Sequence, residues 1–222
     1  MIRTTLPILP TYPPTIQTDR LLLRSFSPTD VTQYHVLRQQ PEVMVWTSAI
    51  HCDETISQTQ EWMARHQTSP DLKTFSFSIE ELSNPGQVIG SAGCSVVPGK
   101  QPEVGYMFRK EMWGRGYATE AVKAVLNAYW DLGRRGVEVE SHLEKEGIVE
   151  EKEHCDQCKD AVDYTSYAAG FQVEKLSAVT VSANVGSRRV LEKLGFVMVK
   201  EFKDWKTGGR ECIEYTLQRP RH

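Results

Sequence analysis

Apolar and polar positions follow two different periods along this chain, and together they predict a domain that mixes strands and helices. Phe75, Phe77 and Ile79 alternate with serine and glutamate, which is the period-two pattern of a half-buried strand. Asn84-Pro85-Gly86 then marks a turn. The other segments that read as strands are residues 21–26, 87–97, 103–109, 178–182, 196–203 and 211–217. The predicted fold class is therefore α/β, in the α+β sense.

Helical periodicity appears between these strands. After Gly116 the apolar residues at 122, 125, 126 and 129 recur with the i, i+3, i+4, i+7 spacing of one helix face. Ser27 with Pro28 and Asp30 has the composition of a helix start, and we expect that helix to run to about Arg38. Two further helices are expected, one from an Asp53 cap to about His66 and one over residues 185–194, ended by Gly195.

The remaining segments divide the chain into regions. Residues 1–17 contain four prolines and no periodic apolar face, so we expect an extended N-terminal arm. One domain is predicted over residues 18–220, interrupted at about 133–172 by an acidic insertion. Within that insertion, residues 137–160 hold nine acidic residues against three lysines, a charge of −6. The whole chain carries −3, so the remainder sums to +3 and favours an anionic ligand.

Composition excludes several classes of protein. The net charge of −3 argues against nucleic acid as the main partner, because counterion release requires clustered Lys and Arg. No apolar run reaches the length of a membrane-spanning helix, and the first residues lack a signal peptide's apolar stretch. Five cysteines at irregular spacing are unlike a disulfide framework. We therefore expect a cytoplasmic protein, monomeric or homodimeric, with no nucleic-acid or membrane partner.

The segment with most chemical content is the glycine loop at the start of the long helix. Gly114 and Gly116 stand between a predicted strand and that helix. Such a loop leaves backbone N–H groups free at the positive end of the helix dipole, where a pyrophosphate binds well. Two glycines also suit a plain chain turn, so the loop alone leaves both interpretations open. The full spacings of a P-loop and of a Rossmann dinucleotide fingerprint are absent.

Three segments, taken together, resemble one known family. They are Thr18-Asp19-Arg20-Leu21-Leu22-Leu23-Arg24, then Glu103 to Phe108 with Trp113-Gly114-Arg115-Gly116-Tyr117-Ala118-Thr119-Glu120-Ala121, and finally Ser182 to Phe196. They are similar in content and order to the GNAT superfamily of N-acetyltransferases, in the branch of the ribosomal-protein alanine acetyltransferases. The resemblance implies a central, mixed, mostly antiparallel and splayed sheet flanked by helices, which binds acetyl-CoA as co-substrate.

The resemblance also implies a set of cofactor-binding residues. In this family the strand before the loop pairs with the pantetheine arm, the loop binds the pyrophosphate, and a second helix start reaches the thioester. Carried over to this sequence, these are Tyr106, Met107 and Phe108, then Trp113, Gly114, Arg115, Gly116, Tyr117, Ala118 and Thr119, and finally Asn184 and Ser187. Trp113 departs from the general family pattern, which has Arg or Gln, but is common in this branch.

The implied reaction is direct attack of a neutral amine on the thioester carbonyl. Glu103 is the candidate base; a solvated carboxylate at a strand end is the alternative. Many members of the family have a Tyr, taken as the general acid, where this chain has Leu191. The acceptor is a protein N-terminus or a small amine, and Trp46 and Phe75 or Phe77 are candidate pocket residues. A non-catalytic acyl-CoA-binding or protein-interaction module is the alternative function.

The acidic insertion contains part of a metal-binding pattern. Cys155 and Cys158 form a C-x-x-C pair beside His154, which is half of a zinc site. A second pair with regular spacing is missing, so we expect a solvated acidic loop and no metal.

Overall fold

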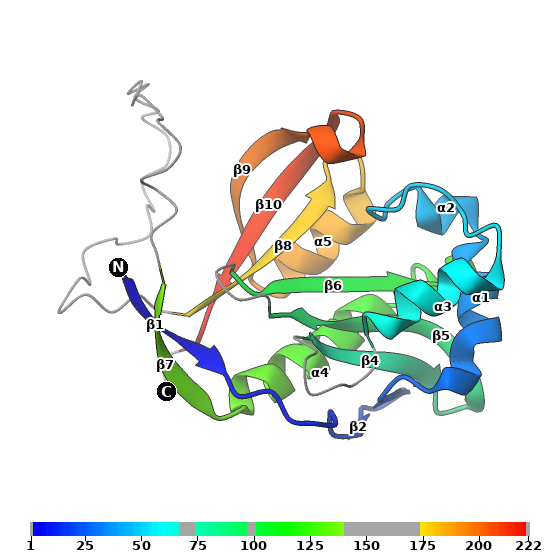
Figure 1. Cartoon of the computed structure of the whole chain (residues 1–222), viewed down its shortest axis with the longest axis horizontal. Helices are drawn as coiled ribbons and strands as arrows, with labels where there is room; N and C mark the ends of the chain where they lie inside the picture. Colours follow the sequence, from blue (N-terminus) through cyan, green and yellow to red (C-terminus); the bar gives the residue numbers. More distant parts are fainter. Residues whose placement is uncertain (1, 67–73, 97–100, 140–173, 221–222) are drawn as a thin grey trace.

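The protein folds around one large mixed sheet (Figure 1). The computed structural model describes residues 2–66, 74–96, 101–139 and 174–220. The eight strands of the sheet lie in the order β2-β3-β4-β5-β6-β8-β10-β9. Their bounds are β2 Ile16–Gln17, β3 Leu21–Arg24, β4 Thr74–Glu81, β5 Asn84–Ser95, β6 Glu103–Phe108, β8 Lys175–Val181, β9 Val197–Asp204 and β10 Arg210–Gln218. All neighbours are antiparallel except β6 and β8, which are parallel. The expected mixed, mostly antiparallel sheet is confirmed.

Helices cover both faces of this sheet (Figure 1). They are α1 Val31–Arg38, α2 Pro41–Met44, α3 Ile56–Ala64, α4 Tyr117–Asp131 and α5 Val185–Lys193, with short 3-10 turns η1 Pro28–Asp30, η2 Lys110–Met112 and η4 Trp205–Thr207. The apolar face predicted for the long helix is confirmed, because its residues at 122, 125, 126 and 129 are buried in the main core. A smaller core of Phe26, Tyr34, Met63 and Val88 lies beneath α1 and α3.

Strand β4 is buried on both of its faces, not half-buried as its alternation suggested. Phe75, Phe77 and Ile79 point into the main core. The alternating residues Ser76 and Ser78 are also buried, because α1 and α3 cover the side of the sheet that the pattern left open to solvent. The turn after β4 also differs from the prediction: it is formed by residues 82 and 83, with Glu81 paired to Asn84.

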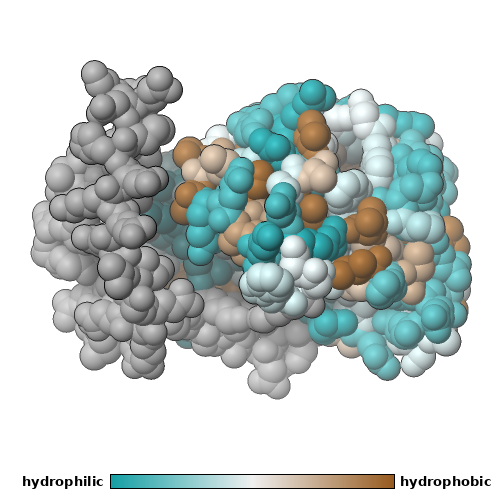
Figure 2. Space-filling model, turned by 90° about the horizontal axis from the view of Figure 1, so that it is seen from above, coloured by the Kyte–Doolittle hydropathy of each residue, from teal (hydrophilic) through white to brown (hydrophobic). Residues whose placement is uncertain are grey.

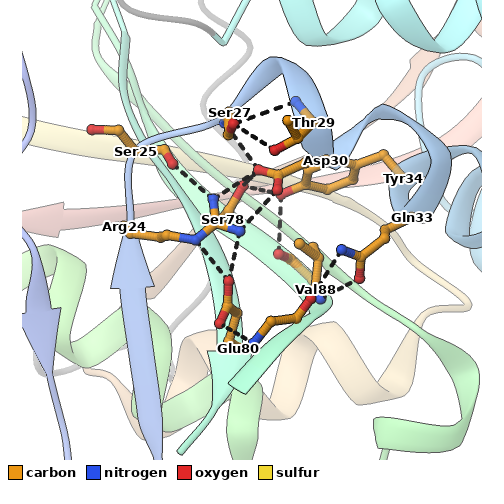
Figure 3. A network of polar contacts seen from close by, with 12 residues as sticks. Arg24, Ser25, Ser27, Thr29, Asp30, Gln33, Tyr34, Ser78, Glu80 and Val88 are labelled. Carbon is orange, nitrogen blue, oxygen red and sulfur yellow. Dashed lines mark hydrogen bonds and ion pairs between the residues drawn. The ribbon is translucent and has the colours of Figure 1, made fainter. Parts of the chain in front are cut away.

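A polar network fixes α1 to the sheet (Figure 3). The Arg24 guanidinium donates to both carboxylate oxygens of Asp30 at 2.8 Å and to Glu80 Oε1 at 2.7 Å. Ser78 donates to the same Asp30 carboxylate at 3.1 Å and lies 2.8 Å from the Tyr34 hydroxyl. The helix start predicted at Ser27 is confirmed, because Ser27 and Asp30 form a capping box.

The start of α3 departs from the prediction. Its cap is Thr55, in a capping box with Gln58, and not Asp53. Asp53 is instead buried in an ion pair with Arg38, with its Oδ2 2.6 Å from Arg38 Nε, and accepts a hydrogen bond from Thr59 at 2.7 Å. The pairing satisfies a buried arginine, a role that local sequence does not reveal.

The N-terminal arm and the start of the insertion meet in a small sheet of their own. Strand β1, Ile2–Pro7, pairs antiparallel with β7, Arg134–Val139. At their base the buried carboxylate of Glu174 accepts hydrogen bonds from Thr5, Tyr129 and Arg134 at 2.7 to 3.1 Å. Most of the predicted insertion, with His154, Cys155 and Cys158, lies outside the described residues.

Candidate active site

Strands β6 and β8 diverge, and the divergence opens one edge of β6. The register between them consists of a single pair, Glu103 with Ser177, whose N–H donates to the Pro102 carbonyl at 2.8 Å. On its other side β6 pairs with β5 along its whole length. The polar backbone groups of β6 beyond that pair therefore face the split rather than a neighbouring strand, which is the geometry that receives an added strand.

Alternation along β6 decides which peptide groups face the split. The Pro102 carbonyl points to β8, whereas the Arg109 N–H donates to Ile89 of β5 at 2.9 Å. Because peptide groups alternate in a strand, those of Tyr106 and Phe108 point to the split, and those of Met107 point to β5. The Phe108 carbonyl already accepts a hydrogen bond from Trp113 Nε1 at 2.9 Å. Three residues are predicted to pair with a pantetheine arm. Of these, Tyr106 has its main-chain N–H and carbonyl best placed for that pairing, because both point to the split.

The glycine loop follows at the end of β6. Gly114 and Gly116 have φ of +74° and +81°, values in the left-handed region that favours glycine. Gly116 is the N-cap of α4 and carries no capping side chain, so the first N–H groups of the helix, those of Tyr117, Ala118 and Thr119, lack the usual side-chain acceptor. Arg115 is exposed beside them. This helix start is suited to bind an anion.

Residues 18–24, the first of the three segments that resemble the family, hold this loop in place. No local pattern in that segment predicts this role. Thr18 and Arg20 both hydrogen-bond the carboxylate of Glu120, in the first turn of α4. Arg20 Nη1 also donates to the Arg115 carbonyl at 3.0 Å. The Tyr117 side chain lies against the Arg20 guanidinium and donates to Glu81 at 2.5 Å, so Tyr117 would offer a ligand its main-chain N–H.

On the opposite side of the split, α5 presents the other predicted residues. Asn184 is the N-cap of α5 and its Oδ1 accepts the Ser187 N–H at 3.0 Å. The Ser187 hydroxyl lies 2.9 Å from the hydroxyl of Tyr106, so a hydrogen bond joins β6 to α5. Burial raises the pKa of Tyr106 to about 12, although the bond to Ser187 acts in the opposite direction. Tyr106 is therefore a protonated hydroxyl at neutral pH.

Glu103 and Leu191 occupy different environments. Glu103 is exposed at the start of β6, where β6 and β8 are still paired. By alternation its side chain shares a sheet face with Gly105 and Met107, the face on which Met107 packs against the smaller core. Leu191 is 1% exposed in the main core, so it packs α5 against the sheet.

Near α2, a second connection joins the C-terminal strand β10 to the segment that follows α2. Arg210, at the start of β10, donates to the carbonyls of Val45 and Thr47 in the segment after α2. Farther along this segment, Ile50 has φ of 66°, a strained value for a β-branched residue of the kind found at functional sites. Trp46 in the same segment is partly exposed, whereas the alternative pocket residues Phe75 and Phe77 are fully buried core residues.

The surface seen from above in Figure 2 carries apolar patches separated by hydrophilic residues. Among the described residues, exposed apolar side chains occur at 45 and 46 after α2, at 197–199 in the edge strand β9 and at 205 after it.

In the part of the chain that the structure covers, no group of three His, Cys, Asp or Glu side chains is arranged to hold a metal ion. Likewise, none of the described helices has the length and apolarity to span a membrane.

The divided sheet, the open edge of β6 and the glycine loop at the start of α4 define a class of acyl-CoA-binding α/β domains. The family described as acetyltransferase (GNAT) domain matches residues 20–197 of this chain. The chain therefore belongs to the GNAT acetyltransferase family, as the three sequence segments predicted.

The chain also resembles a Bacillus subtilis protein in sequence and several acetyltransferases in fold. The uncharacterized protein YkkB of Bacillus subtilis is 34% identical over 116 residues, which cover 50% of this chain and 64% of that protein. An acetyltransferase of the GNAT family from Bacillus anthracis has a TM-score of 0.63 at 18% identity, over 93% of this chain and 99% of that chain.

Two structural neighbours carry a more specific description. RimL, a ribosomal-protein alpha-N-acetyltransferase solved with coenzyme A, has a TM-score of 0.64 at 11% identity, over 92% of this chain and 98% of its own. The spermidine N-acetyltransferase of Vibrio cholerae, solved with CoA and spermine, has a TM-score of 0.61 at 13% identity, over 91% and 97% of the two chains. At these identities the likeness shows the fold alone.

Proposed function

We propose that this protein transfers the acetyl group of acetyl-CoA to a primary amine. The observation that carries the proposal is the open edge of β6, which ends at the glycine loop before α4. An extended pantetheine arm fits a strand edge, and its pyrophosphate fits the helix start that Gly116 leaves without a cap. The strand edge leads to the helix start, just as the pantetheine arm of coenzyme A leads to its pyrophosphate.

The protein's contribution to the reaction is mainly positioning. With the thioester held in the split, the amine nitrogen attacks the carbonyl carbon and forms the C–N bond, and the C–S bond then breaks to release the thiolate of CoA. Placing both reactants in one complex replaces an encounter in solution, an effect that supplies about 7 to 11 kcal/mol in favourable cases. Main-chain N–H groups of β6 that face the split are candidate donors to the developing oxyanion.

Proton removal from the amine is assigned to Glu103, acting directly or through water. Its support is its place beside the point where β6 and β8 separate, on the sheet face toward α1 and α3. A carboxylate there is reached by an acceptor that enters from that face, while the acyl donor lies along the edge of β6.

Proton delivery to the thiolate is assigned to the hydroxyl pair of Tyr106 and Ser187. These two groups, 2.9 Å apart, join β6 and α5 across the split, and Leu191 has no proton to donate. The raised pKa of Tyr106 keeps its hydroxyl protonated at neutral pH. Because a thiol has a pKa of about 8.5, the thiolate needs little assistance, so we expect a modest rate effect from this pair.

For the acceptor, we propose an N-terminal peptide amine or a small amine that enters beside the segment after α2. The support is the tie between Arg210 and that segment, the strain at Ile50 and the exposed Trp46. The structural neighbours include enzymes described for a ribosomal-protein N-terminus and for spermidine, two chemically different primary amines.

The proposal is tested by acetyl-CoA turnover with a panel of amines. Thiol release is measured for N-terminal peptides with different first residues, for spermidine and for other small amines, and the products are identified by mass as a gain of one acetyl group. Acetyl-CoA at 100 times its dissociation constant should stabilise the fold by about 2.7 kcal/mol. Stabilisation without turnover of any amine would favour the alternative, a non-catalytic acyl-CoA-binding module. A flat thermal-shift curve at millimolar acetyl-CoA, in folded protein, would refute both.

A further inference from the structure

The helix start offered to the pyrophosphate contains a negative charge of its own. Glu120 lies in the first turn of α4, and its N–H makes the first helical hydrogen bond back to Gly116. A carboxylate in that turn is attracted by the same positive helix end as a phosphate and repels the phosphate. A protein that binds an anion at this place therefore has to keep the Glu120 carboxylate away from the free N–H groups.

The structure shows how this carboxylate is held. Its Oε1 accepts hydrogen bonds from Thr18 Oγ1 at 2.6 Å and from the Arg20 N–H at 3.1 Å. Its Oε2 accepts from Arg20 Nε at 2.7 Å and lies 2.6 Å from Arg20 Nη2. Four donors occupy the acceptor capacity of a carboxylate, so none is left for the helix N-terminus. Burial acts to raise the pKa of Glu120, but the hydrogen bonds from Thr18 and Arg20 outweigh it and lower that pKa.

Arg20 also touches the loop that the pyrophosphate would approach. Its Nη1 donates to the Arg115 carbonyl at 3.0 Å, and its guanidinium carbon lies 4.6 Å from the centre of the Tyr117 ring. A Cβ added to Gly116 would lie 3.5 Å from Arg20 Nη2. The guanidinium thus contacts both Glu120, 100 residues away in sequence, and the glycine turn through the Arg115 carbonyl, 95 residues away.

We propose that Arg20 and Thr18 are positioning residues that neutralise Glu120 and hold its carboxylate away from the start of α4, so that this helix end can take the pyrophosphate of CoA. The inference rests on the proposed function, because it concerns the same phosphate site. Arg20 acts through Glu120 and Arg115, and it needs no direct contact with the cofactor.

The proposal makes an unusual prediction for a pair of mutations. Removing Arg20 alone leaves the Glu120 charge uncompensated beside the phosphate site, so Arg20→Gln should raise the Kd for CoA at least tenfold, about 1.4 kcal/mol. Glu120→Gln removes the opposing charge, so its Kd should match that of the wild type or be lower. The double variant lacks both the Arg20 and the Glu120 charge, so its Kd should return to within about threefold of the wild type.

Calorimetric titration with CoA measures the four proteins. Arg135→Gln and Glu61→Gln, at exposed positions in β7 and α3, remove the same charges elsewhere and should bind CoA like the wild type. Arg135 follows the C-terminal end of α4, whose 15 residues span about 22 Å from the glycine loop. Melting temperature without ligand checks that each variant is folded. Arg20→Lys keeps the charge and loses the forked geometry, and it should bind between the wild type and Arg20→Gln.

Two further measurements distinguish an electrostatic role of Arg20 from mechanical support of the loop. The rise in Kd for CoA caused by Arg20→Gln should become smaller as the ionic strength rises by about one decade, because screening weakens the repulsion. With pantetheine, which lacks the phosphates, Arg20→Gln should leave the Kd unchanged. A double variant as weak as Arg20→Gln, or a Glu120→Gln protein that also binds weakly, would overturn the proposal and leave only a structural brace. If the wild type itself fails to bind CoA, the proposed function falls instead.

Discussion

Gly116 offers the sharpest test of the phosphate-loop assignment. The residue has φ of +81° and ψ of 0° as the N-cap of α4, and its N–H belongs to the turn that we propose binds the pyrophosphate. Gly116→Val forces a β-branched side chain into the left-handed region and places a side chain where the loop is otherwise open. Both fold stability and cofactor affinity should therefore fall, for separable reasons.

The cost to stability follows from the backbone alone. An added Cβ would meet only Arg20 Nη2, at 3.5 Å, which is ordinary van der Waals contact. The left-handed conformation costs a non-glycine residue about 1 to 2 kcal/mol, which lowers the melting temperature of a protein this size by about 2 to 8 °C. Cofactor affinity should fall at least tenfold, about 1.4 kcal/mol, because the new side chain intrudes on the phosphate path.

Gly208→Val provides the matched control. Gly208 has φ of +82°, and a Cβ added there would meet no atom within 4 Å, but the residue lies in the turn between β9 and β10. It should lose similar stability and bind CoA like the wild type. Calorimetric titration with CoA and thermal melting of both variants complete the test. A folded Gly116→Val protein with wild-type affinity would refute the phosphate-loop assignment.

Three further predictions concern other parts of the protein. Glu103→Gln should keep CoA affinity and lower turnover, most clearly at pH values where the amine is protonated; unchanged rates across that range would assign proton removal to water or to another group. Replacing residues 140–173 with a Gly-Ser linker should leave the Kd for CoA unchanged, because Glu174 binds Tyr129 and Arg134 and so holds the starts of β7 and β8 together without that segment; loss of binding would make the segment structural. Asp30→Asn should cost about 2 to 4 kcal/mol in unfolding free energy at pH 7, because it removes one of the two carboxylates that pair with Arg24 and leaves only Glu80. Burial acts to raise the pKa of Asp30, but its bonds to Arg24 and Ser27 lower it overall, so its contribution is present above a pH of about 4 and is lost as the pH falls through the lower folded pKa. Chemical denaturation across that acid range should show a weaker pH dependence in the variant.

Elements whose signals are local could be predicted from the sequence. The capping box of Ser27, the apolar face of α4 and the alternation of β4 depend on residues within a few positions of one another, so the period or the cap predicted the element. The same holds for the glycine loop, since positive φ at Gly114 and Gly116 is a property of the loop itself. The roles of the predicted site residues in binding and catalysis remain predictions.

Other features depend on which distant segments become neighbours. The Thr55 cap was missed because Asp53, an equally good capping residue, is taken by Arg38 of another helix. The burial of β4 on both faces follows from α1 and α3, which its own alternation does not report.

The sequence by itself determined the family, the starts of α1, α4 and α5 and the loop that suits a pyrophosphate, because each depends on a short run of residues. Only the tertiary structure decided that β6 and β8 separate after one pair, that Tyr106 meets Ser187 across the split and that Arg20 holds Glu120. The physical reason is that these hydrogen bonds join residues about 80 to 100 positions apart, so they depend on strand order and helix placement. Periodicity and capping composition describe neighbouring residues only and do not predict which distant segments meet.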